Sequence, residues 1–158
     1  MFSSLNATIC LPPLPFLSKS LNSSAFGLEP SKKAVNHIKK KFSLINIKEG
    51  FSDNIQFKDN FFDYVHLGFF LYLVDRKQYL KTISEADRIL KFGGYLSIID
   101  FDSPFPYSNK YKHKDGVFSH KIDNSKTFTS TGFYTLINKH TSSLKKKEFN
   151  PDIDQRVS

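Results

Sequence analysis

The chain has 158 residues, of which 39% are hydrophobic and 24% charged, proportions that exclude wholesale disorder and fit one domain with a core closed without disulfides or metal. Cys10 is the single cysteine, so no intrachain disulfide and no cysteine metal cluster can form. The net charge of +8 raises the hypothesis of nucleic-acid binding. However, the lysine clusters at 39–41 and 145–147 are dispersed, which argues against specific nucleic-acid recognition.

The first 28 residues do not have the sequence pattern of a targeting signal or a membrane anchor. No stretch approaches the ~20 apolar residues that are needed to cross a bilayer. The segment "ICLPPLPFL" lacks a preceding basic residue and is interrupted by prolines, unlike a secretory signal. The region is rich in serine and free of acids, as transit peptides are, but it contains no arginine, so the match to a transit peptide is faint. We therefore expect a soluble, cytoplasmic protein without a membrane segment.

Strand-like and helical patterns alternate from residue 24 onward. Ser24–Glu29 predicts a short buried strand ending in an acid, and Ser31 is a candidate N-cap for a helix with apolar residues at three- and four-residue steps. Residues 42–50 alternate apolar and polar side chains, as a strand near a sheet edge does. Phe61–Val74 predicts a strand buried on both faces that runs into a loop. This order is typical of an α/β protein with a parallel sheet.

The second half begins with the clearest helix, which follows Asp75 and carries a continuous apolar stripe as far as Leu90. We expect it to stop at "KFGG", where a glycine can adopt the left-handed conformation that ends helices. Tyr95–Asp102 predicts the next buried strand, followed by an irregular loop over 103–116. Two later strands are expected at 116–122 and 132–140, before a polar tail.

Two motifs carry a resemblance to a known family. "FKDNFFDYV" contains the pattern FxDxxFD, and "ADRILKFGGYLSIIDFD" contains RxLKPGG with Phe92 in place of the usual proline. In this order of strands and helices, the chain resembles the class I S-adenosylmethionine-dependent methyltransferases over residues 16–140. The resemblance implies an α/β fold, a Rossmann-like three-layer sandwich with a mostly parallel sheet, whose first strand is degenerate or missing. It also implies a divergent segment at 1–22, a methyltransferase-like domain at 23–140 and a polar tail at 141–158.

Glu29 matches the acid that holds the ribose of S-adenosylmethionine in this family. In open α/β sheets, ligands lie outside the carboxyl ends of the strands, and a carboxylate there can accept hydrogen bonds from both ribose hydroxyls. The alternative is that Glu29 faces solvent or favours the N-terminus of the helix that follows it.

Five further residues match cofactor-contacting positions of the family. Phe51 would offer adenine an apolar face, and Ser52 or Asp53 a polar contact. Leu67 and Gly68 correspond to the position beside the methionine part of the cofactor. Ordinary loop residues explain these matches equally well, so both interpretations stay open.

The glycine-rich loop of the family is missing from its expected place. It should precede the acid by about 20 residues, which falls on Ile9, yet no glycine occurs before Gly27. Either "SLNATICL" replaces the first strand, with "PFLSKSLNS" as a shortened helix, or the chain is a fragmentary copy that lost that strand. The loss would leave backbone groups unpaired in the middle of the sheet. "DIDQRVS" also begins like a final strand that ends early, and we favour a fragmentary family member.

Candidate bases for methyl transfer occur near the predicted strand ends, but their spacing singles out none of them. They are His66, Asp100, Asp102, His113 and His120. A lone histidine at a strand end is more often structural, and Asp100 and Asp102 would point to opposite faces of a continuing strand. No grouping has metal-ligand spacing, so no metal is expected, and no catalytic residue is assigned.

The sequence thus predicts an S-adenosylmethionine-dependent methyltransferase that is either active or inactive. Its methyl acceptor, a small molecule or another kind of molecule, is not identified. The competing hypothesis is a non-catalytic remnant whose basic surface binds an acidic partner or nucleic acid.

Overall fold

A computed structural model describes residues 6–8, 24–42, 45–144 and 154–158. The chain divides into two compact units: residues 1–68 with 76–97 form the first, and residues 69–75 with 98–158 form the second. The predicted division at residues 22 and 140 stays a prediction. None of the helices in the described part of the chain is long and apolar enough to cross a membrane.

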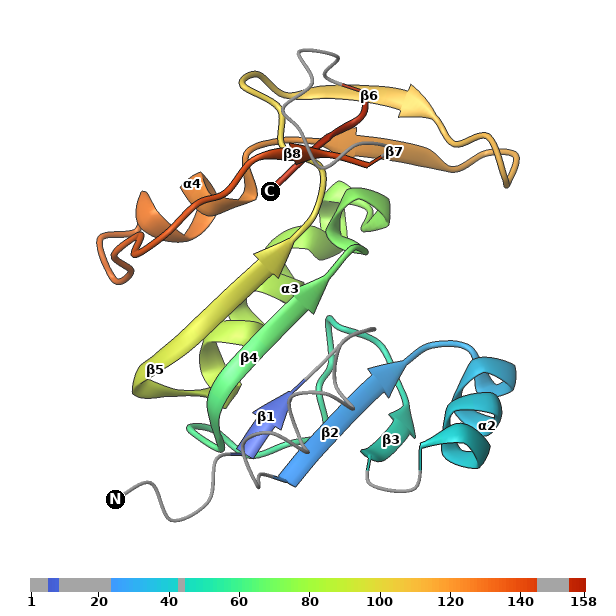
Figure 1. Cartoon of the computed structure of the whole chain (residues 1–158), viewed down its shortest axis with the longest axis vertical. Coiled ribbons are helices and arrows are strands. Elements are labelled where there is room, and N and C mark those ends of the chain that lie inside the picture. The colour runs from blue at the N-terminus through green and yellow to red at the C-terminus, as the bar shows by residue number, and fades with distance from the viewer. Residues whose placement is uncertain (1–5, 9–23, 43–44, 145–153) are drawn as a thin grey trace. The chain divides into compact units, whose positions relative to one another are not determined.

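The first unit is built on a five-stranded sheet in the order β3-β2-β1-β4-β5 (Figure 1). The strands are β1 Asn6–Thr8, β2 Ser24–Glu29, β3 Ile45–Glu49, β4 Phe62–Gly68 and β5 Leu90–Ile99. β1 pairs in parallel with β2 on one side and with β4 on the other. The predicted α/β fold with a degenerate first strand is therefore confirmed, since among the described residues only Asn6–Thr8 fill this central place. These residues belong to "SLNATICL", so the first strand is replaced rather than lost, and the favoured explanation of a lost strand was wrong.

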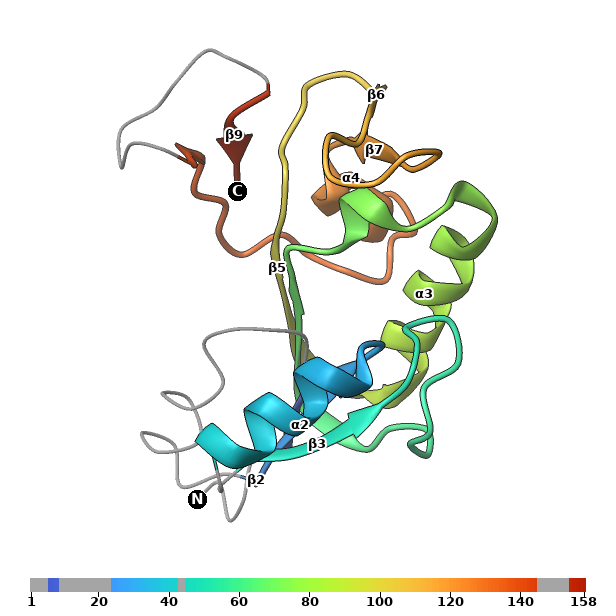
Figure 2. The same ribbon diagram turned by 90° about the vertical axis from the view of Figure 1, so that its right-hand side faces the viewer.

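The helix α2, Lys32–Lys41, covers one face of the sheet beside β2 and β3 (Figure 2). Its N-cap is Ser31, whose side chain accepts a hydrogen bond from the Ala34 N–H at 3.3 Å, as the sequence predicts. Val35 and Ile38 of the helix form a buried cluster with alanine and isoleucine side chains of β2 and β3. These contacts explain why the apolar residues recur at helical spacing while the lysines stay exposed.

The opposite face carries α3, Arg76–Ile89, and the loop that leads to β4. Phe26 follows the buried Ala25 in β2 and therefore points away from α2. Its ring centroid lies 5.4 Å from that of Phe57 and 5.7 Å from that of Phe62. This aromatic cluster fills the space beneath the loop, and the two covering layers make the sheet a three-layer structure.

The end of α3 differs from the prediction. The helix stops at Ile89, and "KFGG" already belongs to β5. The last carbonyls of the helix are satisfied by the loop before β4, because the N–H groups of Asn60 and Phe61 donate to Arg88 and Ile89 at 2.9 Å. A backbone cap supplied from 28 residues away thus replaces the expected glycine stop.

β5 was expected to be buried, and it is not. It lies at the edge of the sheet, and most of its side chains are half-buried or exposed. An edge strand has a neighbour on one side only, which explains how Tyr95 can be 61% exposed.

The second unit contains short elements. They are the 3-10 turn η1 Leu71–Leu73, the hairpin strands β6 Tyr107–Lys110 and β7 Phe118–Lys121, the helix α4 Asn124–Thr129, and the paired strands β8 Ser142–Ser143 and β9 Arg156–Val157. β7 confirms the strand expected at 116–122, whereas β6 lies in the predicted irregular loop. The strand expected at 132–140 was wrong: these residues form no strand, and Phe133 and Ile137 are 85% and 78% exposed.

The expected strand at the carboxyl end is present in part. β9 pairs antiparallel with β8, and Val157 bridges to Phe101. Asp100 and Ser158 exchange two backbone hydrogen bonds of 3.0 Å. The last residues therefore extend the pairing beyond the end of β5.

Replacing Gly94 by alanine should destabilise the first unit by about 1–3 kcal/mol. A Cβ atom there would lie 2.9 Å from the backbone oxygens of Asp63 and Lys91, which cannot yield without moving two strands. Urea unfolding measures the change. The control is Gly93→Asn, because Gly93 has φ of +75° and open space. Asparagine tolerates that conformation, so the control should lose less than about 1 kcal/mol. Equal losses would contradict the packing explanation.

Candidate functional site

The six predicted cofactor residues all lie in the first unit, at the carboxyl ends of three parallel strands. Glu29 is the last residue of β2 and stands opposite Glu49, the last residue of β3. The turn 51–53 follows β3, and Leu67 and Gly68 end β4. β1 separates β2 from β4, so Glu29 and Gly68 are two strand spacings apart, about 10 Å. The structure thus brings these residues to one edge of the sheet.

Of the roles that the sequence left open for Glu29, the structure shows the contact of its carboxylate with the start of the following helix, and the ribose contact stays a prediction. Glu29 Oε1 accepts a hydrogen bond from the backbone N–H of Ser31 at 3.0 Å, next to the start of α2. Among the described residues, Oε2 has no hydrogen-bond partner. Half-buried and held at one oxygen, the carboxylate keeps an acceptor for a ligand at the strand end.

The turn after β3 packs closely against β2. The Gly50 N–H donates to the carbonyl of Glu29 at 3.2 Å. A Cβ atom on Gly50 would lie 2.6 Å from Leu28 Cδ1, so a side chain at this position would displace Leu28. Phe51 is 64% exposed and Asp53 is half-buried. An exposed aromatic side chain beside a strand-end carboxylate can provide the apolar wall of a nucleoside site.

α3 holds the loop that continues from this turn. Ser52 Oγ lies 3.0 Å from Thr82 Oγ1, and the Ile55 N–H donates to Glu85 Oε2 at 2.7 Å. Arg88 donates to the carbonyls of Ile55 and Phe57 at 2.8 Å each. These anchors on α3 were not recognised in the sequence. The signal was present, because residues 82, 85 and 88 are three apart and share one side of a helix.

Glu85 and Arg88 are themselves paired. Arg88 Nε and Nη2 donate to the two carboxylate oxygens of Glu85 at 2.7 and 2.8 Å, and Nη1 donates to Asp59 at 2.7 Å. The Arg88 hydrogen bonds hold the pKa of Glu85 below its usual value, and Glu85 raises the pKa of Arg88. This charge-assisted, two-pronged geometry gives the loop a defined attachment.

His66, in β4, is almost fully buried, and only one of its two ring nitrogens has a hydrogen-bond partner. Its Nδ1 lies 2.9 Å from Ser97 Oγ, while Nε2 is buried without a hydrogen-bond partner. Burial lowers the pKa of the imidazole, so the neutral ring is favoured. The contact with Ser97 fits a structural histidine that joins β4 to β5.

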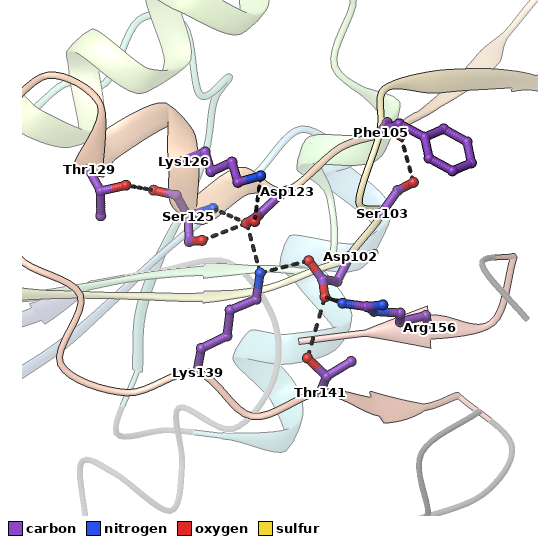
Figure 3. A network of polar contacts seen from close by, with 10 residues as sticks. All are labelled: Asp102, Ser103, Phe105, Asp123, Ser125, Lys126, Thr129, Lys139, Thr141 and Arg156. Carbon is purple, nitrogen blue, oxygen red and sulfur yellow. Dashed lines mark hydrogen bonds and ion pairs between the residues drawn. The ribbon is translucent and has the colours of Figure 1, made fainter. Parts of the chain in front are cut away.

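Asp100 and Asp102, in the second unit, do not form a carboxylate pair. Asp100 accepts backbone hydrogen bonds from Tyr72 and Phe101, and burial raises its pKa to about 6. Asp102 instead lies at the centre of a network of ion pairs (Figure 3). Lys139 and Arg156 each approach its carboxylate to 2.8 Å. Both acids therefore hold neighbouring chain segments together.

The other candidate bases lie on the β6–β7 hairpin or its connecting turn. His120 Nδ1 is 2.7 Å from Ser108 Oγ, and the ring of His113 is 5.3 Å from that of Tyr111. Within the described ranges, no three His, Cys, Asp or Glu side chains gather as metal ligands. The segment 9–23, where the glycine-rich loop was expected, lies outside the described residues.

A family model described as methyltransferase domain matches residues 13–98, which is more than half of the chain. The chain belongs to the methyltransferase domain family. The match contains both the FxDxxFD and the RxLKPGG segments and the strand-end residues above.

Known members of the family resemble this methyltransferase domain to different extents. Demethylmenaquinone methyltransferase of Staphylococcus saprophyticus is 40% identical over 60 residues, or 38% of this chain and 25% of that protein. The structure of a SAM-dependent methyltransferase of Thermotoga maritima, described as a possible histamine N-methyltransferase, is 26% identical with a TM-score of 0.50. The alignment covers 63% of this chain and 45% of that one. The chain thus spans a quarter to a half of the length of these relatives.

Several structures match almost the whole chain. A SAM-dependent methyltransferase of Methanosarcina mazei aligns with 96% of this chain and 88% of its own, with a TM-score of 0.71. At 17% identity, this likeness shows the fold alone. It confirms the Rossmann-like architecture that the sequence predicts.

The burial of His66 predicts a pH dependence of the methyltransferase domain's stability. The pKa of His66 is lower in the folded chain than in the unfolded chain. Below about pH 6.5 the unfolded chain therefore binds more protons, and the free energy of unfolding decreases as the pH is lowered. Asp100 titrates in the opposite sense, so the difference from a variant isolates His66. As the pH falls from 7.5 to 5, urea unfolding should show that His66→Phe loses less stability, or gains more, than the wild type. The exposed His37→Phe is the control, and identical profiles for all three proteins would refute the assignment.

Asp102→Asn should destabilise the second unit by about 3 kcal/mol, because it leaves Lys139 and Arg156 without their shared buried counter-charge. Chemical unfolding of the full chain measures the loss. Lys126, whose side chain is 70% exposed and 4.0 Å from Asp123, provides the comparison. Lys126→Gln should change stability by less than about 0.5 kcal/mol. A loss at Asp102 as small as that at Lys126 would show that the network contributes little.

Proposed function

We propose that the chain binds S-adenosylmethionine at the carboxyl edge of its sheet and transfers a methyl group to an acceptor. The observation that carries the proposal is the Glu29 carboxylate, which ends β2 with one oxygen unpaired among the described residues. Family membership supports the choice of cofactor. One structural relative, 10% identical, was solved with S-adenosylhomocysteine bound.

The residues at this edge fit the nucleoside half of the cofactor. The Glu29 carboxylate would accept hydrogen bonds from the ribose hydroxyls, and the exposed ring of Phe51 would lie against adenine. Ser52 and Asp53 would supply polar contacts to the same half. Leu67 and Gly68 would flank the methionine half, where the missing side chain of Gly68 permits close approach.

When bound, the cofactor supplies an electrophilic methyl group on a sulfonium. The contribution of the protein to such a displacement is chiefly orientation, which places the acceptor in line and keeps water away. We assign no catalytic base, since His66 is buried and the acids at 100 and 102 hold chain segments together.

The acceptor is an unidentified molecule. The relatives named above are described with different acceptors, a demethylated menaquinone in one and possibly histamine in another. Their matches cover the family domain rather than whole proteins, so no acceptor is carried over. We place the protein in the cytoplasm, on the grounds of its composition and single cysteine.

One observation favours the alternative function of a basic binding module. α2 carries five exposed lysines and no acid, and they all lie on its solvent-facing side. A polyanion bound there would be released by salt as counterions recondense on it. Binding of this kind would not depend on Glu29.

Thermal melting with S-adenosylmethionine tests the proposal. Ligand at 100 times its dissociation constant should stabilise the chain by about 2.7 kcal/mol. Glu29→Ala should abolish the shift, because it removes the ribose acceptor. Glu49→Ala is the matched control: Glu49 stands opposite in the next strand, is exposed, and should leave the shift intact. No shift for the wild type, with salt-sensitive retention on a polyanion, would favour the alternative.

A further inference from the structure

Three side chains of α3 hold the loop that follows the proposed adenine-contacting turn. Thr82 contacts Ser52 at 3.0 Å, Glu85 accepts from the Ile55 N–H at 2.7 Å, and Arg88 donates to two loop carbonyls at 2.8 Å. We call these side chains, Thr82, Glu85 and Arg88, the α3 anchors. They attach successive points of one loop to successive turns of one helix.

The loop depends on these contacts because it contains little regular structure. Residues 50–61 form no helix or strand. The loop contributes to the core through Ile55, which is 9% exposed, and through Phe57 and Phe61, whose rings join the aromatic cluster. With 29% and 19% of their side chains exposed, Arg88 and Glu85 are shielded enough for their hydrogen bonds to hold the loop.

The contact between Thr82 and Ser52 differs from the other two because it reaches a residue of the proposed site. Thr82 is 1% exposed, whereas Ser52 is half-buried. A hydroxyl has one proton to donate and two lone pairs to accept. The Ser52 hydroxyl uses its proton or one of its lone pairs in the hydrogen bond with Thr82. The directions in which it can form a second hydrogen bond, to a ligand, are therefore restricted.

We propose that the α3 anchors are positioning residues for the adenosine part of the ligand, and that Thr82 acts through Ser52. The inference rests on the proposed function. Thr82 touches no ligand; it fixes the hydroxyl rotor of a residue that does. Glu85 and Arg88 hold the backbone of the loop that continues from Ser52.

A double-mutant cycle tests the role of Thr82, with the affinity for S-adenosylhomocysteine measured by calorimetry. Thr82→Val keeps the side-chain volume and removes one hydroxyl, so it should weaken binding about three- to tenfold, the effect of one hydrogen bond. Ser52→Ala should weaken binding by a similar factor. The double variant should bind no more weakly than Ser52→Ala alone, because Thr82 has then nothing left to position. Thr82→Ser should restore wild-type affinity.

The outcomes separate the two proposals. If the wild type binds no S-adenosylhomocysteine, the proposed function fails and this inference fails with it. If the wild type binds and the two substitutions weaken binding independently or not at all, the inference alone is overturned. Ser84→Ala, an exposed position on the same helix, is the control and should bind like the wild type.

Hydrogen exchange without ligand tests the other two anchors. Arg88→Lys keeps the charge but cannot reproduce the forked contacts to Glu85 and two carbonyls. The Ile55 amide should then exchange at least tenfold faster, while amides of α2 keep their rates. Ile55 exchange that matches the wild type in a folded Arg88→Lys protein would overturn the positioning role of Arg88.

Discussion

The two halves of the sheet are joined by β1, a strand of three residues. Ala7 pairs with Ala25 of β2 on one side and with Tyr64 of β4 on the other. Without this strand, interior N–H and C=O groups of β2 and β4 would lose their partners, at a cost of about 1–3 kcal/mol for each buried group. β1 also sets the spacing between Glu29, at the end of β2, and Gly68, at the end of β4. The geometry of the proposed site therefore depends on a very short element.

The proposed nucleoside site is supported from both faces of the sheet. α2 begins directly after Glu29, and the Ser31 N–H near its start takes one oxygen of the carboxylate. α3, on the other face, holds the loop after Phe51 through Thr82, Glu85 and Arg88. Glu29, the proposed ribose acceptor, and the proposed adenine-contacting turn are thus held in place by different helices. Neither helix belongs to the amino-terminal segment, so this support for the proposed nucleoside site does not depend on a glycine-rich loop.

The sequence was sufficient where local patterns decide the structure. Ser24–Glu29 and its capped helix were predicted as they occur, because alternation, a serine cap and a charged helix face act within one segment. The sequence was insufficient where contacts between segments far apart in the chain determine the structure. The end of α3 is capped by the backbone of Asn60 and Phe61 rather than by glycine, and β5 is exposed because no described strand covers its outer side. Residues 132–140 have the composition of a strand but lie in an irregular segment. The role of Arg88 required knowledge of which loop lies beside it.

The central claim is that the Glu29 carboxylate binds the sugar of a nucleoside at the carboxyl edge of a parallel sheet. The most direct measurement is a crystal structure of the full chain with S-adenosylhomocysteine. The account predicts both ribose hydroxyls within about 2.5–3.0 Å of the Glu29 oxygens, with adenine beside Phe51. A ligand bound elsewhere, or a ribose whose hydroxyls face away from Glu29, would contradict it.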